Sequence, residues 1–272
     1  MSVTLRQLRQ ADQRIDLRGV LPANLAGLNA QEIGVMPLHL GNRRHPLSEL
    51  FAVEIDTRDT DLLTVVPADG RIDYIGAGLQ GGRIEVTGDA GDLLGAGMTG
   101  GGIRVSGNVG DNAGSAMRAG ELQIDGNAGN SLGGPVGGGR LGQQGGLIRV
   151  LGTVGECAGE RMRRGMLLID GDGGDRLGHR MIAGTVYCGG RTGVLTGYAM
   201  RRGTLILRRA PGSLPSTFAD NGRQPLPFLA LLRRELARLT HGQSDLGDSM
   251  ADVQRYVGDL AYDGHGEILI LD

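Results

Sequence analysis

The segments GRIEVTGDAGDLLGAGMTG (residues 82–100) and GGIRVSGNVGDNAGSAMRA (residues 101–119) are consecutive copies of one 19-residue unit. Each copy carries an aliphatic residue at position i and a second one at i+2, where one copy has Cys188 instead, followed by several glycines and, in most copies, a methionine. The first aliphatic residue of the successive copies falls at Ile84, Ile103, Leu122, Ile148, Leu167, Val186 and Leu205. One step measures 26 residues, so seven residues are inserted within the glycine-rich run 133–146, which we expect to form a protruding loop.

A unit of this length cannot bury its own apolar face, so its copies are expected to stack on one another. Residues i and i+2 of a strand point the same way, which gives each copy one inward-facing aliphatic pair. Nineteen residues are too few for a helical repeat of about 33 residues or more. The sequence therefore predicts an all-β fold, a right-handed parallel β-helix of about seven coils, whose corner glycines permit positive φ.

The regions outside the repeat predict a division of the chain into three parts. Residues 1–71 form an N-terminal capping region, with a short helical pattern at 23–33 and a strand at 50–55. The glycine-rich β-helix takes residues 72–209. Residues 210–272 form a proline-rich link, a helix whose leucines recur at helical spacing before Gly242, and a tail with an apolar strand at 268–271.

Composition narrows the class of protein. The net charge of −2 gives no reason to expect nucleic acid as a partner. No run of 18 apolar residues predicts a membrane span, and the N-terminus has charges where a signal peptide has its apolar core. We therefore expect a cytoplasmic protein. Cys157 and Cys188 occupy different columns of the repeat and are expected to be reduced thiols.

A search for chemistry predicts no catalytic, cofactor-binding or metal-binding residue. Residues 76–81 and 95–100 match GxGxxG, but a strand of the repeat follows each of them where a nucleotide site needs a helix. The five histidines have no metal-ligand spacing, and no serine lies in GxSxG. The outward-facing positions between the paired aliphatics place no two acids on neighbouring coils.

Two surface features are predicted as partner contacts. The outward column turns apolar at Leu168, Tyr187 and Ile206, so the helix after the repeat or a partner subunit is expected to cover it. Corner positions on three successive coils carry the second feature, a ridge of Arg161, Arg163, Arg164, Arg180, Arg201 and Arg202. The ridge could contact a partner or a substrate, or it could be a solvated edge partly neutralised by Asp170, Asp172 and Asp175.

The repeat unit resembles the glycine-rich β-helix of the C-terminal domain of glutamate synthase and of the C subunit of formylmethanofuran dehydrogenases. The flanks favour the second family. LAGL (25–28), GN (41–42), GDLA (258–261) and GHGEI (264–268) resemble the two ends of that C subunit. In methanogens, the C subunit belongs to a molybdenum or tungsten dehydrogenase. In methylotrophic bacteria, it belongs to a formyltransferase/hydrolase complex, which the lysine-free composition favours.

The resemblance implies a non-catalytic scaffold subunit without a cofactor of its own. The complex would pass a formyl group from tetrahydromethanopterin to a methanofuran-type carrier and hydrolyse it to formate. Its other subunits, which would be amidohydrolase-like, formyltransferase and dehydrogenase-like, would carry the metal. The carriers of this family bear a glutamate-containing tail that the arginine ridge could hold. The alternatives are a methanogen-type dehydrogenase subunit and a stand-alone β-helix enzyme or binding protein.

Overall fold

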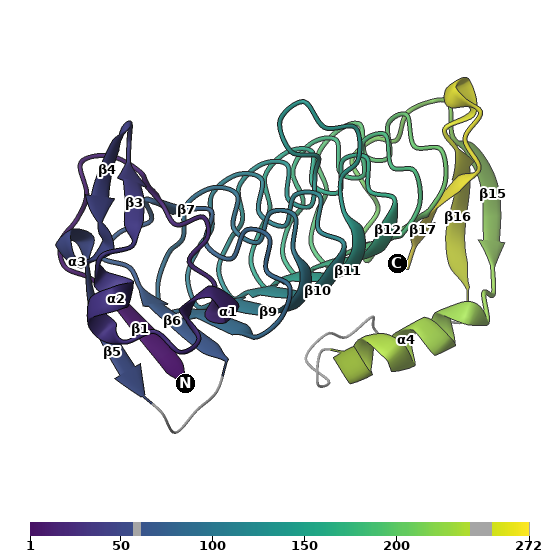
Figure 1. Cartoon of the computed structure of the whole chain (residues 1–272). Helices are drawn as coiled ribbons and strands as arrows, with labels where there is room; N and C mark the ends of the chain where they lie inside the picture. Colours follow the sequence, from purple (N-terminus) through teal and green to yellow (C-terminus); the bar gives the residue numbers. More distant parts are fainter. Residues whose placement is uncertain (57–60, 240–251, 272) are drawn as a thin grey trace.

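The computed structural model describes residues 1–56, 61–239 and 252–271 of the 272-residue chain. Each copy of the repeat contains one strand at the predicted aliphatic pair. The seven strands are β8 (Arg83–Val86), β9 (Thr99–Val105), β10 (Ala119–Ile124), β11 (Gln144–Val150), β12 (Arg164–Ile169), β13 (Thr185–Cys188) and β14 (Thr204–Leu207). They lie side by side in chain order, and every neighbouring pair is parallel. We call one strand with its connection to the next a coil, and Figure 1 shows the coils as a stack.

The register of the strands follows the repeat. Ile84 pairs with Ile103, and Leu122 pairs with Ile148 across the insertion, so the predicted resumption in register is confirmed. Both residues of each pair are buried, including Cys188, which takes the second position in β13. Isolated parallel bridges, such as the one between Ala90 and Val109, join successive coils at a second position. The all-β prediction is thus confirmed, and the core is a column of stacked aliphatic and methionine side chains.

The sheet continues beyond the predicted repeat at both ends. Before β8 come β5 (Phe51–Asp56), β1 (Ser2–Gln7) and β6 (Leu62–Val66), and after β14 come β17 (Gly266–Ile270), β16 (Val253–Gly258) and β15 (Ala219–Gln224). Together they make a 13-stranded sheet in the order β15-β16-β17-β14-β13-β12-β11-β10-β9-β8-β6-β1-β5. The sheet crosses both predicted domain boundaries, and the division of the chain into domains stays a prediction.

The coil that contains β6 was not predicted from the repeat because its spacing is irregular. Leu63 pairs with Ile84, a step of 21 residues rather than 19. Pro67 lies against Gly88, at the corner where later coils carry glycine. The rest of this coil follows the pattern, since Gly76 lies 19 residues before Gly95 and both have positive φ.

The N-terminal region forms a small second sheet and three short helices. The sheet contains β2 (Ile15–Asp16), β3 (Pro37–Leu40), β4 (Arg43–Pro46) and β7 (Ile72–Asp73), in the order β4-β3-β2-β7. The helices are α1 (Pro22–Leu25), α2 (Ala30–Gly34) and α3 (Leu47–Leu50). The single helical pattern predicted at 23–33 is wrong in one respect: Gly27 has a φ of 84° and Asn29 caps a new helix through a capping box with Glu32.

Side-chain amide and carboxylate oxygens join successive coils by hydrogen bonds at one corner of the stack. Asp73, Asp92, Asp111 and Asn130 each accept a hydrogen bond from a backbone N–H of the next coil, at 2.7–2.9 Å. Arg14 of the N-terminal region bonds to the first member, with 2.6 Å between its Nη1 and Asp73 Oδ1. Because each side chain satisfies a backbone donor on its neighbour, this ladder fixes the spacing of successive coils.

The insertion and the C-terminal segments complete the fold. Gly133 and Gln143 are buried at the ends of the insertion, while Val136 between them is 37% exposed, and Figure 1 shows the loop projecting beyond the stack. After β15 comes α4 (Phe228–Leu239), and η1 (Leu260–Tyr262) lies between β16 and β17. Gly242, predicted to end the helix, lies outside the described residues. No helix among those described combines the length and the apolar character needed to span a bilayer.

Candidate partner-binding surface

The corner that bears the predicted arginines turns around a column of buried methionines. Met162, Met181 and Met200 are fully buried. The residues before the first two, Arg161 and Arg180, have left-handed backbone conformations, with φ of 50° and 53°. A bulky residue in this region costs about 1–2 kcal/mol. The chain therefore bends sharply just before the methionine.

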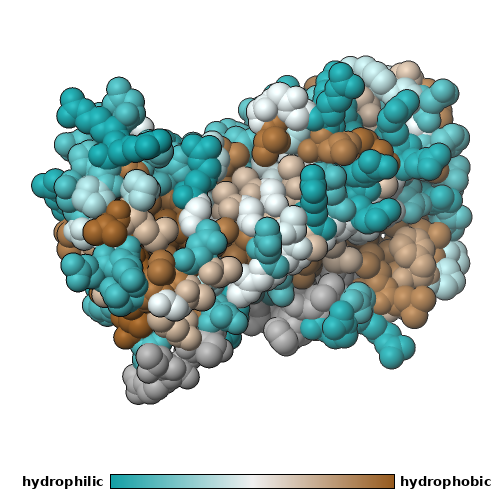
Figure 2. Space-filling view, in the orientation of Figure 1, coloured by the Kyte–Doolittle hydropathy of each residue, from teal (hydrophilic) through white to brown (hydrophobic). Residues whose placement is uncertain are grey.

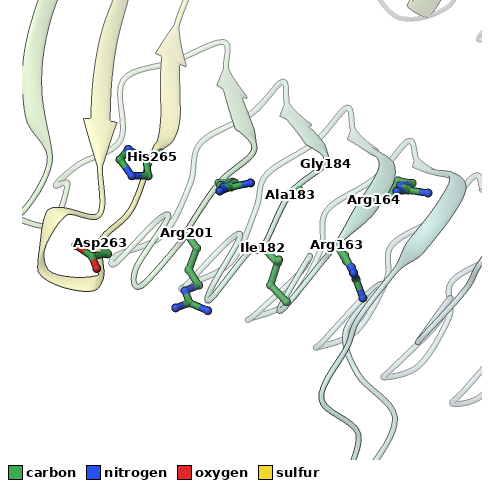
Figure 3. A pocket seen from close by; sticks show the side chains of 9 residues that line it. Arg163, Arg164, Ile182, Ala183, Gly184, Arg201, Asp263 and His265 are labelled. Carbon is green, nitrogen blue, oxygen red and sulfur yellow. The ribbon is translucent and has the colours of Figure 1, made fainter.

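The six arginines of the predicted ridge line two hollows, and Arg201 lines both of them. Arg163, Arg164, Arg201 and Arg202 line a hollow of about 800 Å³, together with Ile182, Ala183, Gly184, Asp263 and His265. We call this hollow the arginine groove. Figure 3 shows Arg163, Ile182 and Arg201 projecting in the same direction from successive coils, while Asp263 and His265 lie at one end.

A second, smaller hollow adjoins the arginine groove and shares Ile182 and Arg201 with it. Its volume is about 320 Å³, and we call it the loop pocket; it is lined by Arg140, Arg161, Arg180, Ile182, Ala199, Arg201 and Tyr262. Arg140 comes from the seven-residue insertion and Tyr262 from η1. Sequence reasoning missed both, because a repeat pattern says nothing about which part of the stack an insertion or a C-terminal turn approaches.

Few acids oppose these arginines. Among the described residues, one ion pair involves the six predicted arginines, a 3.6 Å contact between Arg161 Nε and Glu160 Oε1. The acids expected to neutralise the ridge contact other groups. Asp170 pairs with Arg149 at 2.9 Å. The side chains of Asp172 and Asp175 accept backbone N–H groups of the next coil at 2.7 and 2.9 Å. Partial neutralisation of the ridge by the charge of these three acids stays a prediction.

A line of aromatic rings runs along the coils beside the loop pocket. The ring centroids of His179 and Tyr198 lie 5.7 Å apart, and those of Tyr198 and Tyr262 lie 5.6 Å apart. The two tyrosine hydroxyls are hydrogen-bonded at 2.7 Å. Neither ring nitrogen of His179 has a hydrogen-bond partner in the described chain. Burial, reinforced by nearby arginines, lowers the pKa of His179 and favours the neutral ring.

The apolar part of the outward column is buried inside the chain. Leu168, Tyr187 and Ile206 are at most 3% exposed and belong to a cluster that includes Leu229 of α4. Of the two covers considered from the sequence, the helix is thus in contact with the column, and β16 and β17 add Val253 and Leu269 to the cluster. Figure 2 shows hydrophobic surface near the end of the stack that α4 joins.

The described residues contain no group of three His, Cys, Asp or Glu side chains that could hold a metal ion. Cys157 and Cys188 are both free thiols. Burial raises the pKa of the Cys188 thiol to about 11, so it is protonated at neutral pH and poorly nucleophilic. The arginines that line the two hollows make a cationic surface suited to binding an anionic group.

No protein-family model matches this chain. One crystallised chain aligns over 99% of this protein and 99% of its own length, with 35% identity and a TM-score of 0.89. It comes from the formyltransferase/hydrolase complex FhcABCD of Methylorubrum extorquens, solved in complex with methylofuran. The C subunit of the formyltransferase/hydrolase complex from the same species is 38% identical to this protein over 88 residues. This chain belongs to the family of these C subunits.

More distant members of the family show the same relationship over short segments. The C subunit of the molybdenum-containing formylmethanofuran dehydrogenase 1 is 34% identical over 72 residues in Methanothermobacter marburgensis and 32% identical over 92 residues in Methanosarcina barkeri. These sequence matches span about a third or less of each curated relative, 32% of the Methylorubrum protein and 18% of the Methanothermobacter protein. The resemblance to glutamate synthase stays a prediction.

Proposed function

We propose that this protein is the non-catalytic scaffold subunit of a formyltransferase/hydrolase complex. The observation that carries the proposal is the agreement over 99% of both chains with a chain of the FhcABCD complex, at 35% identity. One feature of this chain supports a role in assembly. Among the described residues, the six arginines of the predicted ridge form one ion pair with an acid, which leaves them available to an acidic partner.

In this proposal the stacked coils form a right-handed parallel β-helix that serves as a rigid platform. Support comes from the parallel in-register strands and from the bridges that join the coils at a second position. Each coil adds about 4.8 Å to the stack, so surface groups on successive coils stand at fixed spacing. Such a platform can hold partner subunits in a defined geometry without taking part in their chemistry.

The proposed reaction belongs to the partner subunits. They would be amidohydrolase-like, formyltransferase and dehydrogenase-like chains that transfer formyl from tetrahydromethanopterin to a methanofuran-like carrier and hydrolyse it to formate. The neighbouring structure supports a furan carrier, since that complex was solved with methylofuran. The proposed contacts of this chain are the arginines of the corner, and a cytoplasmic location remains a prediction.

Purification from the native host tests the proposal. A tagged copy of this chain should co-elute with the other subunits, and the eluate should release formate from formyl-tetrahydromethanopterin when the furan carrier is present. Deleting this chain should abolish the recovery of an intact complex, and the isolated chain should have no activity. Recovery of an active complex in its absence would contradict the scaffold role. Formate release by the purified chain alone would contradict a non-catalytic one.

A further inference from the structure

The residues that line the arginine groove lie on three successive coils, and their arrangement favours a particular kind of ligand. Arg163 and Arg164 lie on one coil, Ile182, Ala183 and Gly184 on the next, and Arg201 and Arg202 on the third. Within the groove, two arginine pairs thus flank a middle coil whose lining residues are small or apolar (Figure 3). Ile182 occupies the position that Arg163 and Arg201 occupy on the flanking coils, 19 residues away on either side.

The four arginines of the groove lack counter-charges within the described chain. All four are exposed, and no described carboxylate forms an ion pair with any of them. Asp263 is the one carboxylate among the residues that line the groove, and it lies at the end next to His265. Like charges at this spacing repel, so an anion seated between the two arginine pairs would be stabilised by both.

The width of the groove limits the shape of that anion. Coils lie about 4.8 Å apart, so the two arginine pairs are separated by about 10 Å. A single extended chain fits between them, whereas a nucleic-acid duplex needs the width of several more coils. Successive side chains of an extended peptide point to opposite sides, so consecutive acidic residues would face Arg163 and Arg164 on one side and Arg201 and Arg202 on the other. The planar guanidinium fork binds carboxylates in a bidentate manner.

We propose that the arginine groove binds an extended acidic segment of another protein subunit, with consecutive acids reaching alternate arginine pairs and the backbone lying over Ala183 and Gly184. The proposal deepens the proposed scaffold function and rests on it. The short side chain of Ala183 and the absence of a side chain at Gly184 leave room for the backbone of the segment. The end of the groove near Asp263 favours the uncharged or basic end of the same segment.

A binding assay with the full chain tests the chemistry of the groove. The probe is a fluorescein-labelled peptide with four consecutive glutamates, compared with its glutamine counterpart and with a single-stranded oligothymidylate, by fluorescence anisotropy at low salt. The acidic peptide should bind at least about tenfold more tightly than either comparison, and added salt should weaken the binding. Equal binding of the glutamine peptide or tighter binding of the oligonucleotide would overturn the proposal.

Charge reversal locates the binding. Arg163→Glu with Arg201→Glu should weaken binding of the acidic peptide by about tenfold or more. The matched control is Arg118→Glu with Arg191→Glu, which makes the same change in net charge at exposed positions outside the groove. The control should keep the wild-type affinity. An equal loss of affinity in the control would mean that the net charge of the protein, and not the groove, determines binding, and it would contradict the proposed site.

Cross-linking in the native complex identifies the occupant. A photo-cross-linking amino acid in place of Ala183 should capture a segment of another subunit that contains neighbouring acidic residues. Capture of a segment without acids, or of no other subunit in an intact complex, would overturn the proposal. Failure of the proposed function looks different, because then the wild-type chain would not co-purify with other subunits at all.

Discussion

One buried carboxylate adds to the strand pairing that attaches the C-terminal tail to the last coil, and its removal should lower the free energy of unfolding. Asp259 is fully buried between β16 and β17. Its Oδ2 accepts the Ala199 N–H at 3.0 Å, and its Oδ1 accepts the Ala261 N–H at 3.2 Å. Ala199 is 4% exposed, so its donor has no access to water once the carboxylate is removed. Ala261 is exposed, and water can replace that bond.

The expected loss in the free energy of unfolding follows from the burial of the Ala199 N–H and the exposure of Ala261. Leaving the buried Ala199 donor unsatisfied costs about 1–3 kcal/mol, while the exposed bond of Ala261 is worth about 1 kcal/mol. Asp259→Ala should therefore destabilise the fold by about 2–4 kcal/mol. Asp259→Asn retains one acceptor oxygen and should lose about half as much. Asp263→Asn is the matched control, because this exposed acid lies in the same turn at a φ of 53°, which asparagine tolerates.

Urea unfolding followed by circular dichroism gives the free energy of unfolding of each variant. Amide hydrogen exchange adds a local measurement, because the Ala199 amide should lose protection in Asp259→Ala and keep it in Asp263→Asn. A loss of stability below about 0.5 kcal/mol in Asp259→Ala, with Ala199 still protected, would refute the assignment. It would mean that the tail is held by the strand pairing of β17 alone.

Three further substitutions test the packing and the electrostatics of the stack. Gly203→Ala should cost about 1–3 kcal/mol in urea unfolding, because the added Cβ would lie 2.8 Å from Met181 Cε at a φ of 100°. Ile206→Ala should cost about 2–5 kcal/mol and raise the protease sensitivity of α4, whose Leu229 packs in the same cluster; unchanged cleavage would argue against this cover. The pKa of His179 is lowered in the folded chain. At pH values between this lowered pKa and about 6.5, the unfolded chain therefore binds more protons at this residue than the folded chain does. Stability should then fall as the pH drops through that window, and His179→Phe should flatten the profile; an unchanged slope would contradict the assignment.

The sequence was sufficient for the strands of the stack because one physical constraint acts on every copy. Two aliphatics at i and i+2 must face inward on each coil, so Ile84 and Leu205 could be placed with the same rule although they lie far apart in the chain. The rule failed at β6, where Pro67 replaces a corner glycine and the step lengthens to 21 residues. It also did not predict that β17 pairs with β14, because the intervening residues carry no repeat.

The surface was less predictable than the core because the repeat fixes the position of a residue along the stack but not its direction at a corner. Arg161 and Arg163 lie two residues apart and were expected on one ridge, yet the left-handed backbone at Arg161 sends them to different hollows. The acids near them in sequence were expected to neutralise the ridge. Backbone N–H groups on the next coil compete for those acids, and the ladder geometry gives Asp172 and Asp175 to the backbone.

The same repeat that builds the core also sets the spacing of charges on the outside, and this links the fold to the proposed binding. A 19-residue period returns each corner position to the same edge, so arginine at one position on alternate coils becomes two cations about 10 Å apart. Replacing the middle arginine by Ile182 converts a continuous ridge into a groove. The irregular segments then shape its surroundings, since the insertion brings Arg140 to the neighbouring pocket and the turn before β17 brings Asp263 and His265 to the end of the groove. In the proposed binding, these departures from the repeat would set the specificity, and they are the positions at which substitutions should alter binding without altering the stability of the stack.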